Sequence, residues 1–300
     1  MWSKPWKMKE GSVICICLFA ICVILQLIAG PLDWNLFAWP VNLIALILFL
    51  GSSLAIFLLR NRFYFFEFMG SLKAAVPSMM FVCGITVIMG LTRQNDSADA
   101  PVGLLGFSRM LSSWPFVLLY LWMALIVCQA VLKEGRYWKW RRLPAFAFHL
   151  GLLLVLLTGT LGSADMSMLS MAVNDKLPEK MAVDDNGKMH ELPISILLRD
   201  FDIREDQPGR IQYIADISIW SRGGKEESAV LSVNKPFRID GRKIYLSDFD
   251  ETKGADSDTC TLDIVSDPWL PGVYAGIYLM LAGAACMIFM RKSSSKQESE

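Results

Sequence analysis

The sequence predicts a polytopic α-helical membrane protein with a mainly β domain inserted before its last membrane helix. Three observations predict this class. Hydrophobic residues make up 54% of the 300-residue chain, and the mean hydropathy is +0.40, so the chain is more apolar than an average soluble domain. Six apolar runs approach the length of membrane helices. A polar segment with a two-residue alternation separates the last two runs.

The six runs are close to the ~20 residues that an α-helix needs to cross a hydrocarbon core. They cover residues 13–32, 40–59, 74–91, 114–132, 143–161 and 273–290. The first run is long for the apolar core of a signal peptide and no small-residue cleavage site precedes Pro31, so we expect a retained helix. The expected domains are a five-helix membrane region at 1–163, a β domain at 164–268, and a final helix with its tail at 269–300.

Lysine and arginine placement predicts the orientation, because short loops rich in these residues stay on the cytoplasmic side. Four basic clusters lie on one side of the six runs: Lys4, Lys7 and Lys9; Arg60, Arg62 and Lys73; Lys133, Arg136, Lys139, Arg141 and Arg142; Arg291 and Lys292. The short loops on the opposite side contain one basic residue, Arg109, apart from Arg93 at the end of the third run. We therefore expect both termini inside and the large polar domain extracytoplasmic. The formal net charge of zero gives no indication of nucleic-acid binding.

The polar segment shows the periodicity of β-strands. In RIQYIADISIW, apolar side chains from Ile211 to Ile219 alternate with polar ones, which is typical of a half-buried strand. Further strands are expected at 194–201, 228–233, 243–249 and 259–265, with turn signals at Pro208-Gly209, Gly223-Gly224, Asp240-Gly241 and Lys253-Gly254. This pattern predicts an antiparallel sandwich or an open barrel.

Neither the cysteines nor the common motifs indicate catalysis by this chain. Six of the seven cysteines lie in apolar runs, so they are expected to be small buried hydrophobic residues, as is the isolated Cys260. Cys15 and Cys17 lack the two-residue spacer of a redox pair. The sequence contains no P-loop, GxGxxG, HExxH or GxSxG motif, and we assign no catalytic residue.

His149 is the residue that most requires an explanation. It is the only ionisable side chain between Arg142 and Asp165, and it lies roughly 9 Å into the fifth run at 1.5 Å per residue. Burial disfavours the imidazolium, so we expect a neutral ring with one nitrogen lone pair for a metal. Two interpretations stay open: an interhelical hydrogen bond, or axial ligation of a haem iron.

Axial ligation by His149 would require a second protein. An octahedral haem iron takes two axial ligands, and no other histidine lies in an apolar run. The second ligand would therefore come from a partner. His190, in the polar stretch DDNGKMHELP, is expected to be solvated surface.

Three stretches of the sequence form one ordered pattern. The first, FHLGLLLVLLTGTLGS, carries His149, and the last, SDPWLPGVYAGIYLMLAGAACMIF, is expected to form a glycine-containing final helix. Between them, VNKPFRIDGRKIYLSDFD carries a spaced pattern of Asn234, Pro236, Gly241 and Tyr245. Together they resemble the ResB/CcsB family of cytochrome c biogenesis proteins of the system II pathway, over roughly residues 74–290. The resemblance implies an integral protein of the bacterial inner (cytoplasmic) membrane.

The resemblance implies a haem-handling subunit of a membrane cytochrome c synthase, acting as a non-autonomous part of the complex. Such a subunit would work with a CcsA/ResC-type membrane partner, export haem b held transiently between the two, and present it to the CxxCH motif of apocytochrome c for thioether attachment. His149 matches the family's membrane haem ligand, so its metal contact would be through haem iron only. A thioredoxin-like thiol reductant and membrane lipid are further implied partners. The family is usually drawn with three helices before the outer domain, whereas this chain has five.

A second hypothesis comes from a different class of protein. The chain could instead be a non-catalytic membrane assembly scaffold, whose outer β domain docks apocytochrome or the thioredoxin-like reductant while the partner does all the haem work. The two hypotheses differ in one observable. Only the first requires that haem in the co-purified complex depend on His149.

The orientation leads to a first testable prediction. Reporter fusions at Ser221, inside the polar domain, and at Glu300, at the C-terminus, should report opposite sides of the membrane, because the sixth run separates them. Alkaline phosphatase should be active only at the first position and green fluorescent protein only at the second. Activity of one reporter at both positions would contradict the topology and haem export together.

Overall fold

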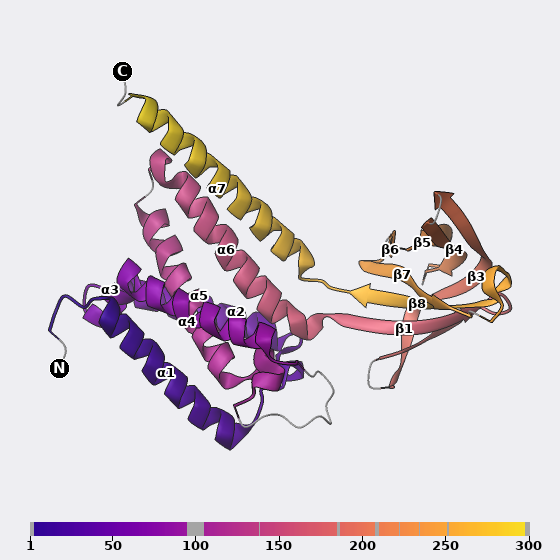
Figure 1. Ribbon diagram of the computed structural model, residues 1–300, viewed down its shortest axis with the longest axis horizontal. Helices are drawn as coiled ribbons and strands as arrows, with labels where there is room; N and C mark the ends of the chain where they lie inside the picture. Colours follow the sequence, from indigo (N-terminus) through magenta and orange to yellow (C-terminus); the bar gives the residue numbers. More distant parts are fainter. Residues whose placement is uncertain are drawn as a thin grey trace. The chain divides into compact units, whose positions relative to one another are not determined.

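The computed structural model describes residues 3–94, 105–137, 139–184, 187–207, 210–221, 223–233, 235–250 and 252–297. These residues form two compact units, which we describe separately. The helical unit comprises Met1–Ala164 and Trp269–Glu300, and the β unit comprises Asp165–Pro268. Within the described residues, six helices are long and apolar enough to cross a membrane (Figure 1).

These six helices coincide with the predicted apolar runs. They are α1 (Met8–Ala29), α2 (Val41–Leu59), α4 (Leu72–Leu91), α5 (Trp114–Arg136), α6 (Leu143–Gly162) and α7 (Leu270–Gln297). A short helix, α3 (Tyr64–Met69), lies between α2 and α4 and was not predicted. The predicted end of the first run, residue 32, is wrong, because α1 ends at Ala29. Gly30 adopts a φ of +71° and donates its N–H to the Gln26 carbonyl. That left-handed residue ends α1 before Pro31.

The boundary difference that matters most for the site lies at the end of α5. The sequence placed its end at residue 132, because Lys133, Glu134 and Arg136 read as a charged loop. The helix instead continues through Arg136. Lys133 and Arg136 lie in its last turn, where cations interact favourably with the helix dipole. The added turn is decisive for the site, because it places Glu134 on a helix.

Buried polar side chains tie α1 and α2 to the other helices. The Gln26 side chain of α1 accepts from the Trp114 backbone N–H at the start of α5 (3.0 Å). Asn42 of α2 donates to the Leu161 carbonyl of α6 (3.2 Å), and Gln129 of α5 donates to the Ser53 carbonyl of α2 (2.9 Å). Helices α1 and α2, the two in addition to the three usually drawn before the outer domain in the resembled family, are therefore integral parts of this bundle.

Helices α6 and α7 approach each other closely through glycine (Figure 1). A Cβ atom on Gly276 of α7 would lie 2.7 Å from the Gly151 carbonyl oxygen of α6, and one on Gly283 would lie 2.6 Å from the Pro144 carbonyl oxygen. Small residues permit this backbone-to-backbone contact between apolar helices. The pairing fixes α7 against the helix that carries His149.

The β unit is one antiparallel sheet of eight strands. The strands are β1 (Ser167–Asn174), β2 (Glu179–Val183), β3 (Met189–Gln207), β4 (Arg210–Trp220), β5 (Glu226–Ser232), β6 (Phe237–Ile239), β7 (Arg242–Phe249) and β8 (Thr259–Ser266). Their order is β5-β4-β3-β2-β1-β8-β7-β6. The sheet curls, so that the edge strands β5 and β6 lie in contact and a bridge joins Ser232 to Lys235. Of the two predicted arrangements, a single curled sheet matches the open barrel.

The interior of the sheet follows the predicted alternation with two exceptions. Ser218, which was predicted on the polar face of the strand, is fully buried, and its hydroxyl donates to the Glu226 carboxylate of β5 (3.1 Å). Ala215, Ile217 and Ile219 of β4 are fully buried in the core of the β unit. Ile211 was predicted on the same buried face but is 58% exposed, because it lies next to the β3–β4 turn and beyond the core. Strands β1, β2 and β6 were not predicted, and the turn signal at Pro208-Gly209 lies outside the described residues.

The close approach of α6 and α7 leads to a second prediction. Gly276→Ala should lower the free energy of unfolding by about 1–3 kcal/mol, because the new methyl group meets backbone atoms that can move only with the helix. Gly159→Ala in α6 is the matched control, since no atom lies within 4 Å of its Cβ position. Thermal unfolding of the full chain in detergent measures both. Equal stability of the two variants would contradict the packing.

Candidate functional site

His149 lies on α6 and faces Glu134 near the end of α5. Its Nδ1 atom is 3.1 Å from Oε1 and 3.0 Å from Oε2 of the Glu134 carboxylate. The two helices form an antiparallel hairpin joined by residues 137–142, so the added turn of α5 runs beside the first turns of α6. The predicted interhelical hydrogen bond of His149 therefore exists, and it uses only one of the two ring nitrogens.

The carboxylate determines which nitrogen carries the proton in the neutral ring. An ionised carboxylate only accepts hydrogen bonds, so in a neutral ring paired with it Nδ1 is the donor to Glu134 and Nε2 carries the lone pair. Within the described part of the chain, no hydrogen-bonding partner faces Nε2. A histidine that donates through one nitrogen to a carboxylate is oriented for metal ligation through the other, and the carboxylate raises its basicity.

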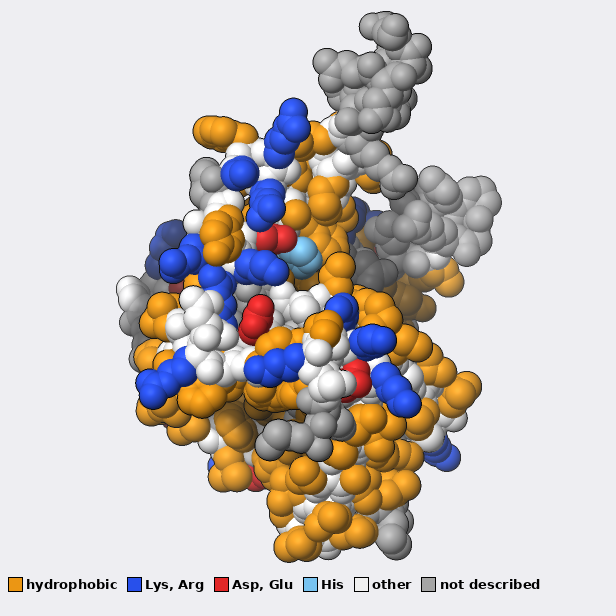
Figure 2. All heavy atoms as spheres, turned by 90° about the vertical axis from the view of Figure 1, so that its left-hand side faces the viewer, with side chains coloured by type: hydrophobic (Ala, Val, Ile, Leu, Met, Phe, Trp, Pro, Cys, Tyr) orange, Lys and Arg blue, Asp and Glu red, His pale blue; other side chains and the backbone are white. Residues whose placement is uncertain are grey.

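The pair is accessible from outside the helical unit. The His149 side chain is 35% exposed and that of Glu134 is 19% exposed. Lys133, Arg136, Arg141 and Arg142 around the hairpin are exposed as well. Figure 2 shows lysine and arginine side chains gathered on one face, around a histidine that lies beside an acidic side chain. A ligand held at Nε2 could thus be shared with another protein.

Sequence reasoning missed Glu134, although one signal was available. Glu134 is the only acidic residue between Lys133 and Arg142, within the most basic cluster of the chain. Glu134 is a single carboxylate among several cations, and it precedes His149 of the apolar helix by 15 residues. At that separation a tight helical hairpin can bring the two side chains together. The assignment of the segment to a loop concealed that relation.

The other predicted residues do not join His149. His190 lies on β3 in the β unit, where its Nε2 is 2.9 Å from Oδ2 of Asp184, and its side chain is 38% exposed. Among the described residues, no group of three or more histidine, cysteine, aspartate or glutamate side chains is placed to hold a metal ion.

Cys260, the cysteine of the β unit, is buried within the sheet. Only 3% of its surface is exposed, and this burial raises the pKa of its thiol to about 12. The thiol stays protonated at neutral pH and is a poor nucleophile. Every described cysteine is free.

The spaced pattern in the β unit is a turn and packing element. Gly241 and Asp240 adopt φ values of +74° and +46° in the two-residue connection between β6 and β7, which is the conformation of a type I′ hairpin turn. Tyr245 lies on β7 opposite Asp263 of β8. Asn234, the first residue of the pattern, lies outside the described residues.

Together, these features define a class: an apolar helical bundle with an antiparallel β domain inserted before its last helix, and one ligand-type histidine on the helix that leads into that domain. Residues 137–260 match the ResB-like family. The match begins in the α5–α6 connection and ends within β8, so it includes His149 and most of the β unit.

Individual relatives agree with this family. Two proteins named "Cytochrome c biogenesis protein CcsB", from Prochlorococcus marinus strains NATL1A and NATL2A, are 29% and 28% identical to this chain over 109 residues. The matched stretch is 36% of this chain and 25% of each relative, so it spans about a quarter of their length. These matches confirm the predicted resemblance to the ResB/CcsB family.

A solved structure, "Cytochrome c Heme Lyase CcmF", aligns with 81% of this chain and 44% of its own chain. The TM-score is 0.38 and the sequence identity is 14%, so this likeness supports no argument about fold or function.

Proposed function

We propose that this chain is a haem-handling subunit of a membrane cytochrome c synthase. In this proposal it acts in cytochrome c maturation with a CcsA/ResC-type membrane partner, helps to export haem, and presents it to the CxxCH motif of apocytochrome c. The observation that carries the proposal is the orientation of His149, whose Nδ1 is held by Glu134 while Nε2 remains available. The relatives named for cytochrome c biogenesis support the same role.

The residues fit one axial position of a haem iron. A bound haem would supply the group to be attached, and this chain would hold it through Nε2 of His149. The described part of the helical unit contains no second histidine, because His190 belongs to the β unit and contacts Asp184. The second axial ligand would come from the partner, consistent with a His149 side chain that is 35% exposed. A haem b shared in this way could leave without breaking a covalent bond.

The thiol chemistry of the proposed reaction would lie outside this chain. Thioether attachment requires both cysteines of the CxxCH motif in reduced form. Cys260 is buried with a raised thiol pKa of about 12, and the described cysteines form no disulfide that could exchange electrons. A thioredoxin-like reductant would therefore supply the electrons. Residues 164–268 would lie on the outer side of the bacterial inner membrane, where apocytochrome and this reductant are met.

Replacing His149 tests the proposal. His149→Ala should leave the complex with the partner assembled but depleted of most of its haem, and cytochrome c maturation should fail. Free imidazole should restore part of the haem, because it can occupy the vacated axial position. The absorption spectrum of the co-purified complex measures haem content, and haem staining of the mature cytochrome measures attachment.

His149→Gln separates ligation from hydrogen bonding. The Gln amide can still donate to the Glu134 carboxylate and preserve the contact between α5 and α6, but it is a poor ligand for haem iron. Loss of haem in both variants, in complexes that still assemble, is the expected result. Restoration of haem and maturation by Gln would instead favour the non-catalytic scaffold.

Glu134 is expected to act as a positioning residue for His149. In Glu134→Gln the side-chain carbonyl can still accept from Nδ1, but the negative charge that raises ligand basicity is lost. Haem retention should weaken roughly 10- to 100-fold, and the midpoint potential of the remaining haem should rise because the ferric iron loses donor strength. Redox titration of the complex measures this shift. Glu191→Gln, an exposed carboxylate on β3, is the control and should leave both values unchanged. An unchanged potential in Glu134→Gln would mean that the contact only joins the two helices.

A further inference from the structure

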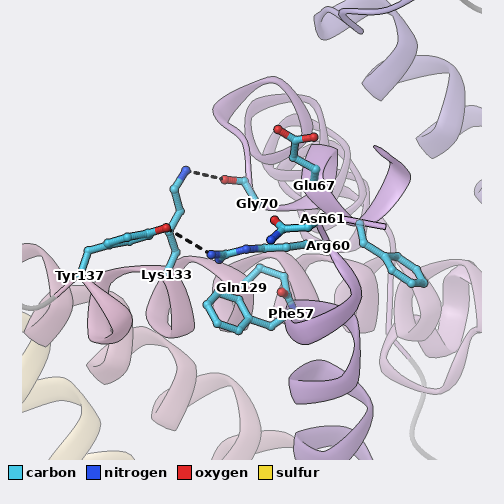
Figure 3. Close-up of a pocket in the computed structure, with 9 residues that line it drawn as sticks. Phe57, Arg60, Asn61, Glu67, Gly70, Gln129, Lys133 and Tyr137 are labelled. Atoms are coloured by element: carbon cyan, nitrogen blue, oxygen red, sulfur yellow. Dashed lines mark hydrogen bonds between the residues drawn. The ribbon is translucent and has the colours of Figure 1, made fainter. Parts of the chain in front are cut away.

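A polar pocket of about 230 Å³ opens beside α2, α3 and α5, apart from the residues of the His149–Glu134 pair. Figure 3 shows Arg60, Lys133 and Tyr137 on one side of this pocket, with Asn61 and Gln129 beside them. Arg60 directly follows α2 and Lys133 lies in the last turn of α5. The pocket therefore lies at the end of the bundle where two of the basic clusters of the sequence meet.

Arg60 is held in place by aromatic rings. Its guanidinium lies 4.1 Å from the centre of the Phe57 ring and 6.0 Å from that of Tyr137, both within the range of cation–π contacts. Its Nη2 atom also donates to the Tyr137 hydroxyl at 3.4 Å. Aromatic contacts orient the guanidinium but leave most of its five N–H donors for another acceptor.

The Lys133 ammonium makes one long hydrogen bond in the described part of the chain. Its Nζ atom donates to the Gly70 carbonyl at 3.4 Å, at the outer limit of a hydrogen bond (Figure 3). An ammonium has three donors, so two remain. Among the ion pairs of the described residues, none includes Arg60 or Lys133. Two cations thus line one pocket without a carboxylate within ion-pair distance.

One acidic residue limits the charge of the ligand. Glu67 also lines the pocket, but its carboxylate points away from Arg60 and Lys133 in Figure 3. Two positive charges and one negative charge give the pocket a net charge of +1. This sum favours a singly charged oxyanion over a doubly charged one. A phosphodiester carries one negative charge and several acceptor oxygens, which suit the fork of an arginine and the point charge of a lysine.

The source of such a group follows from the position of the pocket. The pocket lies where the apolar helix α2 ends and the polar residues Arg60 and Asn61 follow, which is the depth expected for lipid headgroups. Leu58 and Leu59, the last residues of α2, are 65% and 41% exposed. Basic pockets between apolar helices at this level bind anionic lipid headgroups. We propose that Arg60 and Lys133 form a binding site for the phosphodiester headgroup of an anionic phospholipid.

Lipid titration of the full chain in neutral detergent tests this site. Native mass spectrometry with phosphatidylglycerol should detect one bound lipid of higher affinity than phosphatidylcholine. The double variant Arg60→Gln with Lys133→Gln should bind phosphatidylglycerol roughly 30-fold more weakly, from about fivefold per cation near an anionic membrane surface. The matched control is Arg62→Gln with Arg136→Gln, which removes two exposed cations from the same segments but from outside the pocket, and should change affinity less than threefold.

A second variant keeps the test valid if the double variant unfolds. Glu67→Gln removes the one carboxylate that lines the pocket, so phosphatidylglycerol should bind severalfold more tightly. Equal losses in the two double variants, or equal affinity for phosphatidylcholine, would overturn the proposal. Displacement of the lipid by millimolar inorganic phosphate would also overturn it, because the site would then bind a free anion instead of a lipid headgroup.

Discussion

The helical unit depends on one constraint: a polar side chain within an apolar bundle has to find its partner inside the protein. An unpaired polar group in such surroundings costs free energy, and six helices of this composition leave few acceptors. The bundle meets the constraint at several positions by pairing across helices, although the buried Ser53 hydroxyl of α2 has no hydrogen-bond partner among the described residues. Trp122 of α5 donates to the Ser78 hydroxyl of α4 at 2.8 Å, as Gln129 does to α2 and Asn42 to α6. These few bonds give the apolar helices a defined arrangement that hydrophobic contact alone would not specify.

The His149–Glu134 pair differs from the other members of this set. The other polar contacts satisfy backbone groups or a hydroxyl group, whereas this contact joins two ionisable side chains that remain partly exposed. It connects α5 to α6, and α6 is in turn fixed against α7 by the glycine contacts. The imidazole is therefore carried by three packed helices, which would hold the direction of its free nitrogen in the proposed role of metal ligand.

The sequence predicted the six apolar helices and the antiparallel β segment, because hydrophobic length and two-residue alternation are local signals. It failed where the outcome depended on contacts between distant residues. The end of α5 was assigned to a charged loop, and the 15-residue separation between Glu134 and His149 becomes informative only once both residues are placed on helices. Strands β1 and β2 were missed because each is defined by its neighbours: β1 pairs along its whole length with β8, about ninety residues later. Arg60 and Lys133 were recognised as orienting charges, but their convergence on one pocket required the packing of α2 against α5.

The pairing of β1 with β8 has a consequence for the architecture of the chain. Ser167 at the start of β1 lies opposite Ser266 at the end of β8, so the polypeptide enters and leaves the β unit at one place. In the helical unit, Gly162 at the end of α6 likewise lies against Trp269 just before α7. In each unit, therefore, the two chain segments that connect to the other unit lie next to each other. The β unit is an inserted domain with adjacent termini. A short linker could replace it and leave α6 and α7 as a simple helical hairpin. Another domain with adjacent termini could also occupy the same position.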